Sequence, residues 1–521
     1  MGYVLINESI LSSIGNILRS KLYVSSTFTP IEFINGINNI ETLWRNVLEG
    51  NIVNYSDSSI ISINNSIFRY NPNINTISLP NVEYIGDYAF NVCTKLSSIS
   101  IPNCSYIGSY AFYHCRNLSS IYIPNCSYIG SGAFYYCSNI SSISIPNCSY
   151  IGSYAFESCI NLSSISIPNC SYIGSYAFYY CNNLSYVSIP NCSYIGEGAF
   201  KNCSSLSSIS LPNCSYIGYS AFYSCYSLSY ISIPNVEYIG NGVFYYCSNL
   251  SYISIPNCSY IGGSAFYGCF SLTNSNIQDI LNTYKSYSTV INNDVFGNCK
   301  GITSLDLTGY TSIGARAFTY CSNLSYISTP NVEHIADSVF YSCSKLSSIN
   351  LPVCSYIHTS AFNRCINLSY VSIPNCSHIG NSVFVGCTNL SSINLPICSY
   401  IGSGAFSGCT NLSSISIPNC SSIGGSAFYN CRKLSYISLP NCSYIGSSAF
   451  NNCSKLESIY VLSTSIPRLY NANAFYLTPL SNSTYLGYFG SIYVLSSLVD
   501  SFKTATNWKV YSARITAYTG T

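Results

Sequence analysis

Cysteine is the residue with the most chemistry to offer in this chain, which carries 29 of them among 521 residues. Cysteine thiols form disulfides, bind soft metals or act as nucleophiles. All 29 stand in two positions of a frame that a regularly spaced proline sets, 12 of them two residues after the proline and 17 of them at the position thirteen residues after it, where Cys299 and Cys321 keep the frame although the proline itself is replaced. The first set begins with Cys93, Cys115, Cys137, Cys159, Cys181 and Cys203.

The spacing of these cysteines favours a structural role. No Cys-x-x-Cys pair occurs, which disfavours a metal site, and Val82, Val236 and Val332 replace cysteine in the second set. Valine at these positions indicates a small apolar side chain rather than a reactive thiol. We therefore predict two ladders of buried, reduced thiols. Disulfides between neighbours are the main alternative, although stacked side chains that point the same way are poorly placed to form them.

Residues suited to acid–base catalysis are sparse. The chain has 19 Lys and Arg, 17 Asp and Glu and four His, and no Ser/His/Asp grouping or repeated carboxylate pair emerges. We predict no enzyme, no cofactor and no metal. The net charge of +2, without a basic cluster, excludes a polybasic nucleic-acid binder, and no cations accompany the aromatic residues as a nucleic-acid track requires. A hydrophobic fraction of 48% excludes intrinsic disorder.

The proline that sets the cysteine positions recurs every 22 residues, from Pro80 to Pro256 and from Pro330 to Pro440. A phenylalanine ten residues after each proline continues the frame across the gap, so that 17 units run from Phe90 to Phe450, after one degenerate unit that contains Phe68. One unit carries an eight-residue insertion, and the irregular segment covers residues 273–290. Ile277, Ile280 and Leu281 predict a short helix there.

A single unit predicts its own local structure. In the copy that begins with Leu118, apolar and polar residues alternate up to Ile123, as in a short strand with one buried face, and Pro124 ends that strand. Residues 125–129 form a second extended segment, and Gly130 permits a sharp turn. Ser131 stands at a helix N-cap, before a helical turn that carries Ala-Phe-x-x-Cys. Such a unit buries its apolar edge only against further copies, so the fold is a solenoid.

The motifs Leu-x-x-Ile-x-Ile-Pro (Leu118 to Pro124) and Ile-Gly-x-x-Ala-Phe-x-x-Cys (Ile129 to Cys137) resemble the BspA-like class of leucine-rich repeat. Proteins of that class are surface and adhesion proteins of bacteria and some parasitic protists. The resemblance implies an α/β repeat solenoid, with a parallel β-sheet on the concave face, short helices or turns on the other face, and small terminal caps. The predicted solenoid occupies residues 51–461.

The two ends resemble other modules. Residues 1–50 show two helical patterns and resemble an N-terminal module of phage-tail-associated proteins of gut Firmicutes. Residues 462–521 resemble a strand–helix ending that follows such repeats in the same bacteria, and we predict that they form a C-terminal cap. The N-terminus has no basic region and no long apolar run, and no stretch of 18 apolar residues occurs. We therefore expect no membrane insertion, with cytoplasmic synthesis followed by unconventional export, cell-surface association or incorporation into a virion.

A tyrosine and serine surface is the main candidate for binding. The residues that flank the inward-facing Ile of each predicted strand are almost all Tyr and Ser, a pair that also dominates antibody paratopes. The candidate binding residues are Tyr122, Tyr186, Tyr230, Tyr252, Tyr326, Tyr370, Tyr436, Ser188, Ser232 and Asp306. The alternative is that these residues are uncharged fillers that suit a strand. A second column of tyrosines, four residues after proline, predicts a stacked structural ladder.

These features favour a non-enzymatic recognition or adhesion scaffold that binds a protein or glycan on a host or target surface. The alternative is a phage-derived tail or receptor-binding component, which the resemblance of residues 1–50 implies.

Overall fold

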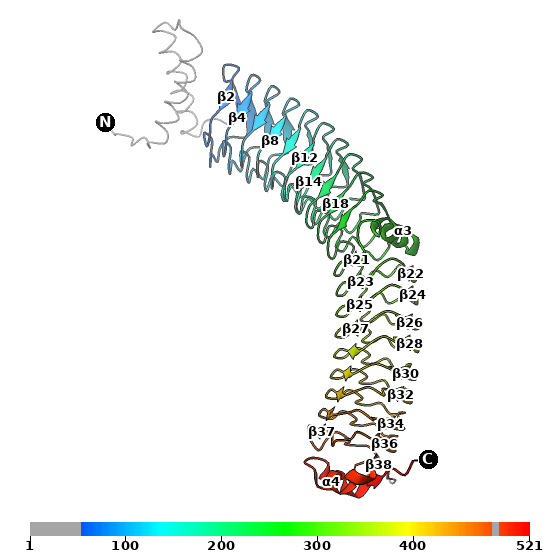
Figure 1. The fold of residues 1–521 in the computed structure, drawn as a ribbon. Helices are drawn as coiled ribbons and strands as arrows, with labels where there is room; N and C mark the ends of the chain where they lie inside the picture. Colours follow the sequence, from blue (N-terminus) through cyan, green and yellow to red (C-terminus); the bar gives the residue numbers. More distant parts are fainter. Residues whose placement is uncertain (1–53, 482–488, 521) are drawn as a thin grey trace, which may run out of the picture. The chain divides into compact units, whose positions relative to one another are not determined.

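The computed structural model describes residues 54–481 and 489–520, so the predicted N-terminal module at residues 1–50 lies outside the described chain. The chain divides into two compact units between Val236 and Glu237. Each unit is a stack of 22-residue turns in which two short parallel strands alternate with tight turns (Figure 1). The described residues contain no helix long and apolar enough to cross a membrane.

The first row of strands in the first unit has the pattern x-Ile-x in most repeats, and we call these the x-Ile-x strands. They are β1 (Asn54–Ser56), β3 (Thr76–Ser78), β5 (Ser98–Ser100), β7 (Ser120–Tyr122), β9 (Ser142–Ser144), β11 (Ser164–Ser166), β13 (Tyr186–Ser188), β15 (Ser208–Ser210) and β17 (Tyr230–Ser232). Neighbours pair in parallel with a shift of one repeat, for example Ser208 beside Tyr230. The central Ile side chain points into the core, and the two flanking residues point outward.

The second row consists of two-residue strands, which we call the Tyr-Ile strands. They are β2 (Ser62–Ile63), β4 (Tyr84–Ile85), β6 (Tyr106–Ile107), β8 (Tyr128–Ile129), β10 (Tyr150–Ile151), β12 (Tyr172–Ile173), β14 (Tyr194–Ile195) and β16 (Tyr216–Ile217). Their tyrosines form the predicted stacked ladder. Tyr150 and Tyr172, for example, have ring centroids 4.8 Å apart and an interplanar angle of 2°.

The second unit repeats both rows. Its x-Ile-x strands are β19 (Tyr252–Ser254), β22 (Ser304–Asp306), β24 (Tyr326–Ser328), β26 (Ser348–Asn350), β28 (Tyr370–Ser372), β30 (Ser392–Asn394), β32 (Ser414–Ser416), β34 (Tyr436–Ser438) and β36 (Ser458–Val461). Its Tyr-Ile row comprises β18 (Tyr238–Ile239), β20 (Tyr260–Ile261), β21 (Val290–Ile291), β23 (Ser312–Ile313), β25 (His334–Ile335), β27 (Tyr356–Ile357), β29 (His378–Ile379), β31 (Tyr400–Ile401), β33 (Ser422–Ile423), β35 (Tyr444–Ile445) and β37 (Arg468–Leu469).

The predicted helical turn in each repeat is wrong. The segment that holds Ala-Phe-x-x-Cys is a tight turn in which two residues, four apart, have left-handed backbone conformation, such as Tyr154 (φ 60°) and Ser158 (φ 58°). An α-helix requires negative φ throughout, so these residues exclude it. Alternate N–H groups instead bond to the next repeat, as when Phe156 N donates to Ala177 O at 2.7 Å.

The predicted N-cap has a different role as well. Where this position holds Asp or Asn, the side chain accepts a hydrogen bond from the backbone of the next repeat, as Asp87 Oδ1 does from Ser109 N at 2.7 Å. The glycine before it permits close packing rather than a left-handed turn. A Cβ on Gly152 would lie 2.7 Å from the carbonyl carbon of Gly130.

The core consists of columns of identical side chains. Phe90, Phe112 and their equivalents are fully buried and stack face to face, with centroids 5.0–5.3 Å apart from Phe68 to Phe222. Columns of Leu, Ile and Cys surround them. Each turn alone has too little apolar surface for a core, so the stacking of repeats supplies the burial that stabilises the fold.

The insertion contains the predicted helix, α3 (Asn274–Tyr284), whose Ile277, Ile280 and Leu281 are buried. At the C-terminal end, β38 (Ser491–Val494) and β39 (Ile515–Ala517) extend the x-Ile-x row beyond β36. Between them lie η2 (Ser496–Leu498), α4 (Val499–Thr504) and η3 (Lys509–Arg514). Trp508 is buried and donates a hydrogen bond from Nε1 to Pro467 O at 2.8 Å. Phe475 stacks on Phe450 at 5.4 Å and lies 6.0 Å from Trp508, and the role of residues 462–521 as a cap stays a prediction.

Candidate functional site

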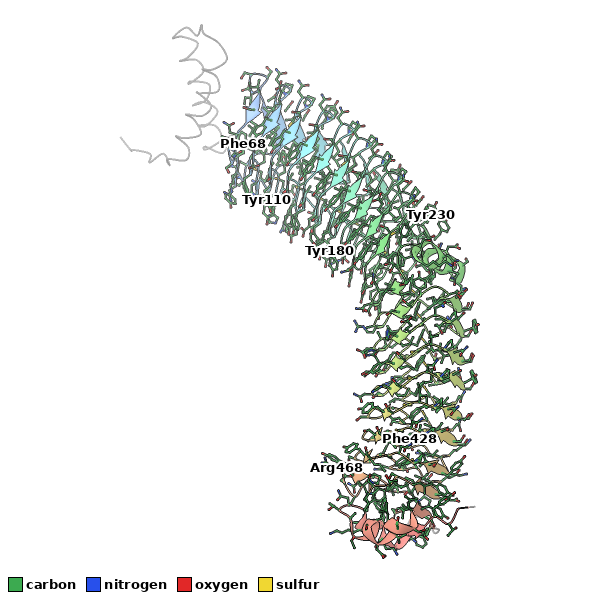
Figure 2. All side chains as sticks on the ribbon, viewed as in Figure 1. Phe68, Tyr110, Tyr180, Tyr230, Phe428 and Arg468 are labelled. Carbon is green, nitrogen blue, oxygen red and sulfur yellow. The ribbon has the colours of Figure 1, made fainter. Side chains whose placement is uncertain are left out.

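The candidate site is the outward side of the x-Ile-x strands, which we call the Tyr/Ser face. Six of the predicted tyrosines occupy the first position of their strand and are 45–60% exposed: Tyr186, Tyr230, Tyr252, Tyr326, Tyr370 and Tyr436. Tyr122 is 57% exposed and occupies the third position of β7. Ser188 and Ser232 also occupy third positions and are half-buried. Figure 2 shows Tyr230 on the strand side of its unit, and Tyr110 and Tyr180 on the turn side.

The strand register places tyrosines on alternate strands in part of each unit. Tyr186 lies beside Ser208, and Ser208 lies beside Tyr230. Because adjacent strands are about 4.8 Å apart, the two tyrosines stand roughly 10 Å apart with a small serine between them. They border a groove of about 270 Å³, which Ser188, Ser210 and two prolines also line. The same alternation recurs in the second unit, where Ser348 separates Tyr326 from Tyr370.

Asp306 has a structural partner that the sequence did not reveal. Its Oδ1 accepts hydrogen bonds from Thr308 N at 3.0 Å and Thr308 Oγ1 at 2.6 Å, and the bond from the Thr308 hydroxyl is the main cause that lowers the pKa of this carboxyl. The side chain of Gln278, on α3, bonds to both the N–H and the carbonyl of Asp306 at 2.9 Å. Asp306 therefore belongs to the junction between α3 and β22, and it interrupts the Tyr/Ser face with a charge.

Helix α3 takes the place of a strand in the x-Ile-x row. Asn276 Nδ2 donates to Ile253 O at 3.0 Å, and its Oδ1 accepts from Ile253 N at 3.1 Å, so one buried amide pairs with the edge of β19. Asn274 Oδ1 accepts from Ser304 N at 2.9 Å on the other side. These side chains satisfy the backbone groups that a continuous row would otherwise pair.

The cysteines of both ladders are buried, and none is bonded to another. Thiols of the larger ladder donate to the phenylalanine carbonyl of the preceding repeat, as Cys115 Sγ does to Phe90 O at 3.0 Å. Thiols of the smaller ladder donate locally, as Cys104 Sγ does to Tyr106 O at 3.3 Å. Burial raises the pKa of Cys104 from 9.0 to about 11, so this thiol remains protonated near neutral pH and is a poor nucleophile and metal ligand.

The described part of the chain offers few groups for metal binding or for chemistry that needs paired histidines. Residues 54–481 and 489–520 contain no group of three or more His, Cys, Asp or Glu that could hold a metal ion. His334 and His378 replace tyrosine in the Tyr-Ile row two repeats apart, with Tyr356 between them in the register of the strands. This arrangement separates the two imidazoles rather than joining them.

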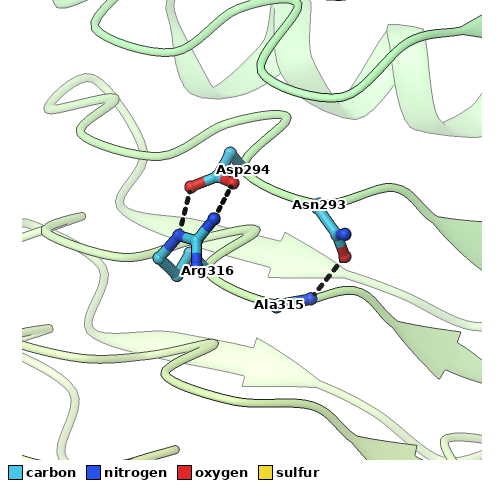
Figure 3. Close-up of polar contacts among 4 residues, drawn as sticks. All are labelled: Asn293, Asp294, Ala315 and Arg316. Atoms are coloured by element: carbon cyan, nitrogen blue, oxygen red, sulfur yellow. Dashed lines mark hydrogen bonds and ion pairs between the residues drawn. The ribbon is translucent and has the colours of Figure 1, made fainter.

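Sequence reasoning missed one charged pair on the turn side. Arg316 and Asp294 occupy equivalent turn positions in adjacent repeats and form two hydrogen bonds, from Nε to Oδ1 at 2.8 Å and from Nη2 to Oδ2 at 2.7 Å (Figure 3). The signal was present, because these are the only charged residues at a position that otherwise holds Gly, Ser or Tyr, and they are one 22-residue repeat apart.

Known proteins resemble this chain in its repeats. A leucine-rich repeat protein from Bacteroides ovatus is 24% identical over 75% of this chain and 88% of its own, with a TM-score of 0.36. A leucine-rich cell surface protein from Faecalibacterium prausnitzii is 23% identical over 70% and 87%, with a TM-score of 0.35. A leucine-rich repeat protein from Eubacterium ventriosum is 19% identical over 78% and 83%, with a TM-score of 0.33. No curated protein matches.

The family comparison is more direct. The profile of the BspA-type leucine-rich repeat region, which spans six copies, matches residues 61–185, 171–289, 289–399 and 377–494. These matches overlap and together span the repeats with the Phe and Cys columns described above. The chain belongs to the BspA-type leucine-rich repeat family.

Proposed function

We propose that this protein is a non-enzymatic recognition scaffold that binds a protein or glycan surface through its Tyr/Ser face. The observation that carries the proposal is the different state of tyrosines in the two strand rows. Ladder tyrosines such as Tyr150 stack on their neighbours, whereas Tyr186, Tyr326 and Tyr370 present more than half of their surface to solvent. An exposed tyrosine offers a rigid contact area and a hydroxyl at low entropic cost.

The alternation of Tyr and Ser makes this face uneven, because the tyrosines project and the serines leave gaps between them. The serine between two tyrosines leaves room for a side chain or sugar ring of a partner, as the groove beside Ser208 illustrates. The face is almost uncharged apart from Asp306, so its binding energy comes from packing and neutral hydrogen bonds. Affinity for a partner is therefore expected to change little between low and high salt.

Surface plasmon resonance on immobilised mucin and fibronectin tests the proposal. The double variant Y326S/Y370S places in these positions the serine that equivalent strands already carry, so the fold is expected to persist. We expect this variant to bind at least several-fold more weakly than the parent chain, since exposed aromatic anchors dominate such interfaces. The control Y429S removes a tyrosine that is 42% exposed on the turn side and leaves binding unchanged. Equal losses in both variants, or no binding by the parent chain, contradict the proposal.

The phage-derived alternative depends on residues 1–50, which lie outside the described chain, and it stays a prediction from sequence. Identification of the genes beside this one tests it, because tail and baseplate genes favour a phage component and cell-wall or secretion genes favour an adhesion scaffold.

A further inference from the structure

The turn side of the second unit contains a pocket that is separate from the Tyr/Ser face. It has a volume of about 510 Å³, which lies in the range of small-molecule sites, about 300–1,000 Å³. Its lining comes from five consecutive repeats. One wall is Ser264, Asp294, Arg316 and Ser338, which share one turn position, and the remaining lining is Tyr245, Tyr267, Thr319, Tyr320 and Tyr341.

Two features open this pocket. Three residues after the turn position of that wall, many repeats have a tyrosine, such as Tyr267 and Tyr341. The two repeats between these tyrosines have Gly297 and Thr319 instead. The Tyr267 ring lies against Gly297, where an added Cβ would come within 2.5 Å of it. The repeats also stand further apart here. Phe296 and Phe318 have centroids 5.9 Å apart, as do Phe318 and Phe340, whereas the spacing returns to 5.2–5.5 Å from Phe362 to Phe450.

The polar wall of the pocket contains an ion pair that can form further hydrogen bonds. Asp294 and Arg316 both have left-handed backbone conformation, with φ of 59° and 58°, at positions where most repeats have small residues or tyrosine. Two of the five N–H groups of Arg316 bond to Asp294, and each carboxylate oxygen of Asp294 can accept a further hydrogen bond. The Arg316 side chain is 56% exposed and that of Asp294 is 14% exposed. The pair therefore offers donors and acceptors side by side while its net charge is zero.

The tyrosines complete the site. Tyr245 and Tyr267 stack with centroids 4.9 Å apart, and Tyr320 meets Tyr341 edge to face at 5.4 Å. Burial, together with the neighbouring Tyr246, Tyr245 and Asp294, raises the pKa of Tyr267 to about 12, so its phenol remains a neutral donor. Aromatic faces beside a planar donor–acceptor pair suit a ring that has an apolar face and hydroxyl groups around its edge.

We propose that this pocket binds a neutral saccharide ring. Adjacent hydroxyls of the sugar donate to the free lone pairs of Asp294 and accept from the remaining N–H groups of Arg316. The C–H face of the ring packs on the exposed ring of Tyr320 and on Tyr341, which both line the pocket. The ion pair does not favour an acidic sugar, because Asp294 already neutralises the charge of Arg316 and would repel the carboxylate of the sugar. The pocket lies on the turn side, so it operates independently of the Tyr/Ser face.

Saturation-transfer NMR on the full chain tests this assignment, with the methyl glycosides of glucose, galactose and N-acetylglucosamine as neutral probes and that of sialic acid as the acidic probe. We expect transfer to the ring protons of at least one neutral glycoside. The variant D294S/R316S restores the serine of other repeats and should weaken that binding about tenfold, as loss of a charge-assisted hydrogen bond does. T319Y should abolish glycoside binding, because the tyrosine ring that neighbouring repeats have at this position would fill the pocket.

The matched control is S407Y, which makes the same kind of change at the equivalent position of a distant repeat, and it should leave binding intact. Circular dichroism verifies that each variant has kept its fold. The assignment is overturned if no neutral glycoside shows transfer, if D294S/R316S binds as well as the parent chain, or if the sialic acid glycoside is the one bound. Loss of binding to mucin and fibronectin in Y326S/Y370S, with glycoside binding retained, would show that the two sites are independent.

Discussion

At the scale of single residues, burial decides what the cysteines do. Thiols such as Cys115 and Cys104 donate to backbone carbonyls inside the stack, where solvent and oxidants have little access. The same environment raises the pKa of Cys104, because an apolar surrounding disfavours the thiolate. The columns thus behave as small apolar side chains with one satisfied donor, which explains why valine replaces them at positions 82, 236 and 332.

The raised pKa values predict a loss of stability in alkali. Burial raises the pKa of Cys104, Cys354 and Cys442 from 9.0 to about 11 in the folded chain. Their stabilising contribution is complete below the unfolded pKa and falls as the pH rises from about 9 towards 11, because the unfolded chain releases thiol protons that the folded chain retains. Urea unfolding at successive pH values measures this slope. Replacing several smaller-ladder cysteines by valine should flatten it, and an unchanged slope would contradict the account.

The stacked phenylalanines give a second prediction at this scale. Phe200 is fully buried between Phe178 and Phe222, at centroid distances of 5.2 and 5.3 Å. Phe200→Ala removes ring contacts on both sides and is expected to cost roughly 3–5 kcal/mol of local stability. Hydrogen exchange should become faster around residue 200 while distant repeats of the same unit retain their protection. Unchanged melting and unchanged exchange in this region would refute the prediction.

At the scale of elements, α3 holds the x-Ile-x row together where the repeat is interrupted. Asn276→Ala removes both bonds to Ile253 and leaves a buried N–H and carbonyl without partners, each of which costs about 1–3 kcal/mol. We expect a lower melting temperature and faster amide exchange at Ile253. Asn282→Ala, at an exposed position on the same helix, is the control and should have little effect. Equal behaviour of the two variants would show that α3 does not support the strand row.

Several elements were predictable because the same sequence pattern recurs in many repeats. The strand before Pro124, the extended segment up to Ile129 and the helix that contains Ile277 all follow from local patterns, and the structure has them. The left-handed turns were missed because Tyr154 and Ser158 give no sign of positive φ. The sign lay in other copies, where Gly132 and Gly268 occupy the same two positions. The Arg316–Asp294 pair required the 22-residue register to be applied across neighbouring repeats.

At the scale of the whole molecule, one template accounts for both the composition and the architecture. Copying a unit that has almost no charge yields a chain with 7% charged residues, and copying two cysteine positions yields 29 cysteines. Each copy contacts its neighbours through identical columns, so stability accumulates by interfaces between repeats. Departures from the template are then informative, since the exposed tyrosines, α3 and the Arg316–Asp294 pair are the places where the surface becomes distinctive.

The central claim is that the Tyr/Ser face is the recognition surface, and tyrosine footprinting of the complex tests it most directly. The protein is captured on whichever of mucin or fibronectin it binds, treated with hydroxyl radicals, and compared with the free chain by mass spectrometry. The account predicts protection of Tyr186, Tyr326 and Tyr370, with unchanged labelling of the ladder tyrosine Tyr150 and the turn-side tyrosine Tyr429. Protection confined to the turn side or to the ladder tyrosines, with Tyr186, Tyr326 and Tyr370 labelled as in the free chain, would contradict it.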